Sequence, residues 1–296
     1  MINNDYRNEL KDKGIEYSNQ ALLSFFEKLD LNLNLCEEVN NIHIGVGETV
    51  SLDKKRASSE YHAADDQIIL DESYLDEMVD FVIDAHEDKK ERAERIAIHD
   101  IASSLIHEKL HALRRIRKPD NAIESKDYYT VIKKYLTQDI NPEYIDPSDV
   151  LLVEHGITDK NDQAAIIRQQ TLLEDSVIEA LSQVIIYNSI PKNSNLTITE
   201  LAAKVEKDDS YFIQAGAKIV ELMGEDQIKR FVTTRFSQEP YSDMFYEMFA
   251  QDYYVLLSDI EEIDEVKNTG MAPSEIILNE FDEIINKQKN ASHKRV

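Results

Sequence analysis

The chain has 296 residues, 42% of them hydrophobic, which is enough to build a sizeable core without disulfide support. Its single cysteine, Cys36, excludes an internal disulfide, and the absence of any run of about 18 apolar residues predicts no membrane span. The net charge of -25 argues against binding to nucleic acid or anionic lipid. The first residues lack the basic and apolar regions of a secretory signal, so we expect a cytoplasmic protein. The sequence leaves its oligomeric state open.

Seven glycines, six prolines and no tryptophan predict a helix-dominated chain with few tight turns. The polar segment from Ser58 to His62, followed by turn residues Asp65 and Asp66, predicts a hairpin with the strand after it. In chain order, the N-terminal elements expected are a helix from Tyr6 to Asp30, strands from Val39 to Val46 and from Gln67 to Leu70, and a helix from Tyr74 toward His86 that Asp71 and Ser73 can cap.

The next predicted helix, Glu91 to Arg117, carries the sequence His107-Glu108-Lys109-Leu110-His111. Because an α-helix turns once in 3.6 residues, both histidines project from one face and can bind the same metal ion. Glu108 lies beside that face, where a carboxylate can accept a proton from a water molecule on zinc. The broad apolar surface of this helix predicts that it is mostly enclosed, and enclosed imidazoles need a partner such as a metal.

The C-terminal half is predicted to be helical after a polar region with a short helix from Tyr128 to Leu136. We therefore expect an N-terminal subdomain at 1–117, a loop-rich insertion at 118–162 and a helical subdomain at 163–296. The helices expected there are Asp162 to Tyr187, Thr199 to Val205, Tyr211 to Met223, Glu225 to Phe236, Tyr241 to Leu257 and Pro273 to Ile285, with a polar, frayed tail from Asn286.

The motif, preceded by a sheet and a supporting helix, resembles the N-terminal half of zincin metallopeptidases over roughly Asn41 to Arg117. The resemblance implies an α+β, mostly helical fold of zincin type, with a small N-terminal sheet and a helical C-terminal half. It also implies that an edge strand lies along the active cleft, and Gln67 to Leu70 or its hairpin partner is the candidate. An ordinary sheet that only covers the motif helix is the alternative.

Catalytic zinc usually has three protein ligands, so a third must come from elsewhere in the chain. The residues after His111 lack the glycine and histidine of the metzincin pattern. The segment from Leu172 to Gln183 resembles the second motif helix of the glutamate-zincin (gluzincin) group. One alignment makes Glu179 the ligand and puts Gln183 where the family has an acid; the other makes Asp175 the ligand and Glu179 the acid that orients a histidine.

Both alignments stay open, because residues 175 and 179 share one helical face. Glu174 points about 100° away from Asp175 and is a weaker choice. A rival, Glu247, lies in a segment resembling the glutamate helix of a toxin-like zincin subgroup. Candidates for stabilising an oxyanion are Tyr187, Tyr211 and His155.

The resemblance implies a zinc-dependent peptidase that cleaves a peptide or protein substrate with zinc-activated water, with Glu108 as general base. A second reading is a zincin-derived binding or regulatory protein in which the metal organises the core without turnover. A third is a helical interaction protein without metal, in which His107 and His111 are ordinary core or surface residues.

Overall fold

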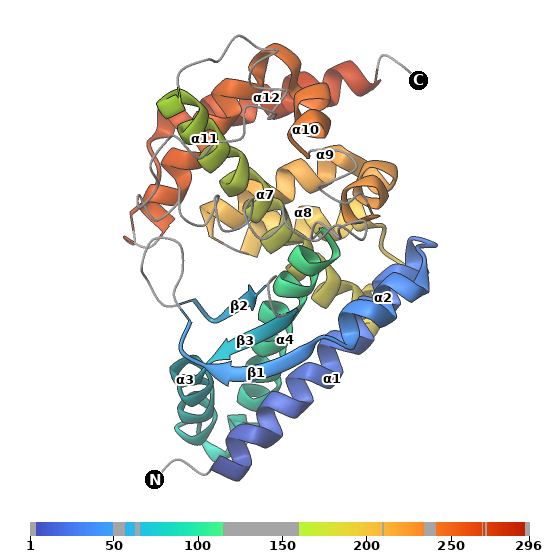
Figure 1. The fold of residues 1–296 in the computed structure, drawn as a ribbon, viewed down its shortest axis with the longest axis vertical. Helices are drawn as coiled ribbons and strands as arrows, with labels where there is room; N and C mark the ends of the chain where they lie inside the picture. Colours follow the sequence, from blue (N-terminus) through green and yellow to red (C-terminus); the bar gives the residue numbers. More distant parts are fainter. Residues whose placement is uncertain are drawn as a thin grey trace. The chain divides into compact units, whose positions relative to one another are not determined.

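The computed structural model describes residues 4–49, 57–62, 66–114, 160–208, 210–233, 241–267, 269 and 271–293. These residues form a mostly helical structure with a small three-stranded mixed sheet (Figure 1). The chain divides into two units, one made of Met1–Arg115 and Ser182–Thr197, the other of Ile116–Leu181 and Ile198–Val296. The predicted insertion, 118–162, lies outside the described residues as far as residue 159, and so do the predicted helix from Tyr128 to Leu136 and His155.

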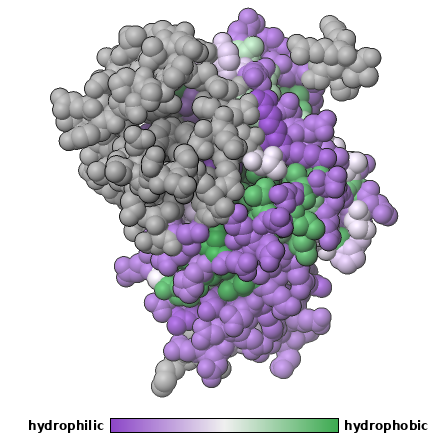
Figure 2. Space-filling model, turned by 45° about the vertical axis from the view of Figure 1, so that its right-hand side comes forward, coloured by the Kyte–Doolittle hydropathy of each residue, from purple (hydrophilic) through white to green (hydrophobic). Residues whose placement is uncertain are grey.

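Hydrophilic side chains cover most of the described surface on the face shown in Figure 2, as the strong net negative charge leads one to expect. Among the helices in the described part of the chain, none is both long and apolar enough to cross a membrane.

The first unit is built around a small sheet and long helices. Its elements are α1 (Asn4–Lys28), α2 (Leu33–Asn40), β1 (His43–Gly47), β2 (Ser59–His62), β3 (Gln67–Asp71), α3 (Glu72–Ile83), the short 3-10 helix η1 (Glu87–Lys89), α4 (Lys90–Arg114), the end of α7 (Lys160–Ser189) and the 3-10 helix η3 (Pro191–Asn193). Helix α4 contacts α1, α2, α3, β2 and β3, so the motif helix is the centre of this unit. Its fully buried apolar residues include Ile101, Leu105 and Ile106.

Strand β3 is the middle strand of the sheet, with β1 parallel on one side and β2 antiparallel on the other. The predicted hairpin is confirmed, because Ser59 pairs with Leu70 and His62 with Gln67. Asp66 makes the turn with a φ of 53°, a left-handed conformation that aspartate tolerates better than most residues. Of the two candidate edge strands, Gln67 to Leu70 is therefore wrong, and its hairpin partner is an edge.

The predicted cap of α3 is confirmed, since the Asp71 side chain accepts a hydrogen bond of 3.0 Å from the backbone N–H of Tyr74. The predicted strand from Val39 to Val46 is wrong in its first half. Asn32 caps a helix, α2, which runs to Asn40 and buries Cys36 and Val39. Strand β1 starts only at His43.

The second unit is helical throughout its described residues. It contains the first part of α7, then α8 (Ile198–Asp208), α9 (Tyr211–Thr233), α10 (Tyr241–Phe249), the 3-10 helix η4 (Ala250–Asp252), α11 (Tyr253–Lys267) and α12 (Glu275–His293). Gly224, with φ 64°, separates the two halves of α9, as the sequence predicted. The prediction of a single helix from Tyr241 to Leu257 is wrong, because Ala250 has a φ of 47° and the helix is interrupted there. Helix α12 extends well into the tail that was expected to fray.

Two positions in the second unit are unusual: a close helix contact at Gly216 and a buried acid, Asp259. Gly216 of α9 lies so close to α7 that a Cβ at this position would be 1.9 Å from the backbone oxygen of Ser176. Asp259 of α11 is 1% exposed and its Oδ2 has no hydrogen-bond partner. Burial, together with the nearby negative charges of Glu280 and Glu262, raises the pKa of Asp259 to about 7.

We expect Gly216→Ala to lower the free energy of unfolding by roughly 1–3 kcal/mol, because backbone atoms cannot move aside as a side chain can. Urea unfolding measures this change. The matched control is Gly47→Ala, whose Cβ would lie 3.4 Å from Ile69 Cγ2, an ordinary contact. A Gly216→Ala protein as stable as the wild type would contradict the close approach of α9 to α7.

We expect Asp259→Asn to stabilise the protein at pH 8 more than at pH 5. Asp259 holds its proton to about pH 7 when folded but releases it near 3.8 when unfolded, so its ionisation costs the folded protein stability as pH rises between these values. Between pH 5 and pH 8 the gain from asparagine should grow by roughly 2–3 kcal/mol, because about two pH units of that range lie below the folded pKa. Urea unfolding at both pH values tests this, with Asp226→Asn, an exposed position, as control. An equal gain at both pH values would refute the assignment.

Candidate metal centre

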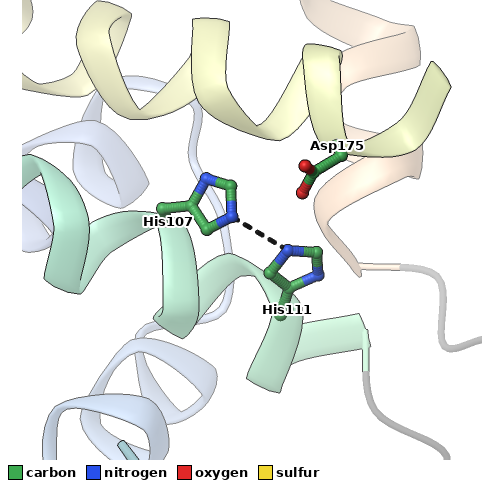
Figure 3. Close-up of side chains that lie close together, drawn as sticks. All are labelled: His107, His111 and Asp175. Carbon is green, nitrogen blue, oxygen red and sulfur yellow. Dashed lines mark hydrogen bonds between the residues drawn. The ribbon is translucent and has the colours of Figure 1, made fainter. Parts of the chain in front are cut away.

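The two motif histidines project from one face of α4 and turn their rings toward each other (Figure 3). His107 Nε2 and His111 Nε2 are 3.1 Å apart, and the ring centroids are 4.8 Å apart. Both side chains are partly buried. Two nitrogens bound to one tetrahedral zinc at about 2.0–2.1 Å would lie about 3.3 Å apart. The pair is therefore already close to the spacing that a shared zinc ion requires.

Helix α7 is held against α4 one turn before His107. Ser182 Oγ lies 3.2 Å from Ser103 Oγ, and Gln183 Nε2 donates a hydrogen bond of 2.9 Å to the same Ser103 oxygen. Ser103 and Ser182 are buried, so this polar contact is shielded from water. Gln183 stands where the resembled family has a second acid. Its hydrogen bond to Ser103 helps to fix the position of the end of α7 along α4.

Asp175 lies on the same continuous helix, two turns before Ser182. Its carboxylate forms a group with the two histidines in which one ligand atom from each residue lies within 4.8 Å of the others (Figure 3). Among the described residues, this is the group of histidine, cysteine and acid side chains that could hold a metal ion. It contains Asp175 and neither Glu174, Glu179 nor Glu247.

The donor set fits zinc, which accepts imidazole nitrogen and carboxylate oxygen. Three protein ligands would leave a fourth tetrahedral position for water or substrate. The longest separation in the group, up to 4.8 Å, exceeds the ideal 3.3 Å by roughly 1.5 Å, which a change of side-chain rotamer can close.

Glu108 points toward the sheet and holds its edge strand β2. Its Oε2 accepts a hydrogen bond of 2.8 Å from the backbone N–H of Tyr61, and its Oε1 accepts one of 3.0 Å from Ser59 Oγ. The side chain is only 7% exposed. A carboxylate offers about four lone-pair sites, so two remain after these bonds. Glu108 is thus anchored to the strand and can still accept a proton.

Glu179 lies one turn after Asp175 and forms an ion pair with Lys267, with 2.8 Å between Oε1 and Nζ. The Lys267 ammonium also sits 4.2 Å from the centre of the Phe212 ring. Burial acts to lower the pKa of Lys267, but attraction to Glu179 and Asp175 outweighs it, so the pKa is raised and the lysine is charged. No local pattern in the sequence singles out Lys267 or Ser59.

The other sequence candidates lie elsewhere. Glu247 is 62% exposed at its side chain and pairs with Arg230 at 2.9 Å. Tyr187 follows Asp175 by 12 positions on α7, about 18 Å along the helix axis, which is too far to donate to an oxyanion beside that acid. Tyr211 is 40% exposed at the start of α9. Tyr187 is therefore not placed at the group, and His155 lies outside the described residues.

Lys109, the third residue of the motif, points away from the histidines into the packing between α4, α1 and α2. Its ammonium is completely buried and donates to Ser18 Oγ at 2.9 Å, to Asn40 Oδ1 at 3.0 Å and to Asn19 Oδ1. Three acceptors satisfy the three donors of a lysine. This contact ties both helices to the motif helix.

Comparison of the chain with models of protein families, with curated proteins and with solved structures gave no match.

Proposed function

We propose that this chain is a zinc-dependent peptidase of gluzincin type. The observation that carries the proposal is the grouping of His107, His111 and Asp175, with the glutamate of the same motif on the neighbouring side of α4. Of the two sequence alignments, the grouping favours the one in which Asp175 is the ligand. Zinc bound there would polarise a substrate carbonyl and lower the pKa of a bound water molecule toward about 7.

Protein residues would transfer the proton and position the substrate. Glu108, held by Ser59 and Tyr61, has lone pairs left to take a proton from the attacking water and to pass it to the leaving amine. Strand β2 is an edge strand directly beside Glu108, so an extended peptide placed along it would have its backbone near the proposed base. The peptide or protein substrate, and the cytoplasmic location, are part of this proposal.

A non-catalytic metal-binding protein is the second candidate, and one observation favours it. Both carboxylate oxygens of Glu108 bind β2, which gives this residue a structural role that needs no catalysis. Variants of Glu108 can separate the two functions.

We expect the protein, purified without a metal-affinity tag, to bind one zinc ion per chain. We expect the zinc affinity to fall more than about 100-fold in each of the variants His107→Ala, His111→Ala and Asp175→Ala. Losing a residue that only hydrogen-bonds to a ligand costs up to about 100-fold, and losing the ligand itself should cost more. Metal analysis after dialysis against a chelator gives both quantities.

The controls are His43→Ala, an exposed histidine, and Glu247→Ala, the rival acid. Both should keep the zinc. Zinc retained in Asp175→Ala but lost in Glu179→Ala would select the other alignment. A wild-type protein that takes up no zinc would leave the metal-free interaction protein as the better interpretation.

We expect Glu108→Gln to abolish peptide cleavage while stability and zinc content stay close to wild type. A glutamine keeps both contacts with β2, because its oxygen can accept from Tyr61 N–H and its amide can donate to Ser59 Oγ, whose hydroxyl can turn to the Ser104 carbonyl 3.3 Å away. Only the basicity is lost.

The measurement is mass-spectrometric detection of cleavage in a mixed peptide library, with and without a zinc chelator. Glu108→Ala is the contrast: it loses both contacts and should also unfold at lower urea concentration. Cleavage that persists undiminished in Glu108→Gln would exclude Glu108 as the base, and a wild-type protein that binds zinc but cleaves nothing would favour the non-catalytic function.

A further inference from the structure

We propose that Lys267 is a positioning residue that keeps Glu179 off the metal and so preserves an open coordination position. This inference rests on the proposed zinc site. It concerns a residue 88 positions from Glu179, outside every motif that the sequence displays.

Glu179 is the other acid on the face of α7 that carries Asp175. It follows Asp175 by four residues, the same spacing that lets His107 and His111 address a single ion. Its side chain is one methylene longer than that of Asp175. A carboxylate with this reach, beside a divalent cation, would bind the cation unless another positive charge held it.

Lys267 supplies that charge from a fixed position. Its Nζ is 2.8 Å from Glu179 Oε1, and both side chains are 24% exposed, so the pair is largely shielded from water. The ammonium is also held over the Phe212 ring at 4.2 Å. Lys267 ends α11 and Phe212 lies in the first turn of α9, so three helices fix this charge next to Glu179.

The arrangement separates the roles of two acids on one helical face. Asp175 joins the histidine group, whereas Glu179 is neutralised by Lys267. A fourth protein ligand would convert an open catalytic site into a closed structural one. Lys267 therefore determines which of these two kinds of site the chain forms.

The test uses the full chain loaded with zinc or with cobalt(II), whose visible absorption reports the coordination of the metal. Lys267→Met retains the apolar stem and removes the charge. We expect it to bind zinc about tenfold more tightly than wild type, the scale on which outer partners act on metal affinity. Its cobalt form should bind imidazole about tenfold more weakly, because Glu179 then fills the open position. Imidazole is a neutral probe, so loss of the lysine charge does not itself repel it.

The double variant Lys267→Met, Glu179→Gln should return both affinities to wild-type values, and Lys267→Arg should retain them. If Lys267→Met unfolds, as judged by circular dichroism, Lys267→Gln replaces it. Unchanged zinc and imidazole affinities, or changes that persist in the double variant, would overturn the inference while leaving the zinc site intact. A wild-type protein that binds neither metal would instead overturn the proposed site itself.

Discussion

Buried polar side chains of α4 need partners on neighbouring elements, and three of them organise the first unit. Glu108 is satisfied by β2, Lys109 by α1 and α2, and Ser103 by the end of α7. Each of these three side chains therefore binds a different neighbouring element. His107 and His111 share a further face of α4, and their ring nitrogens form one group with a carboxylate oxygen of Asp175.

Local patterns in the sequence predicted the long elements and the histidine face, because periodicity and the 3.6-residue turn act within a few residues. Helices α1, α3, α4 and α7 and the hairpin at Asp66 were found in this way. The sequence did not predict helix α2, which is short and rich in asparagine. It also did not predict the helix interruption at Ala250, where there is no glycine or proline. Such features depend on the packing around them.

Choosing among the acids required contacts between distant positions. Glu179 was equal to Asp175 by spacing alone; the two differ in that Asp175 groups with His107 and His111, whereas Glu179 pairs with Lys267, 88 residues away. Likewise, nothing near Ser59 indicated that it would bind a carboxylate 49 residues later. Pairings over such separations are set by the tertiary fold, so no local signal in one sequence reveals them.

The division of α7 has a consequence for the order in which the protein can form during synthesis. The first unit needs Ser182–Thr197, yet residues 116–181 are made in between. At roughly 5–20 residues per second, a ribosome leaves α4 without this part of its covering for several seconds. The nascent protein therefore passes through a stage in which His107 and His111 have been made but Asp175 has not.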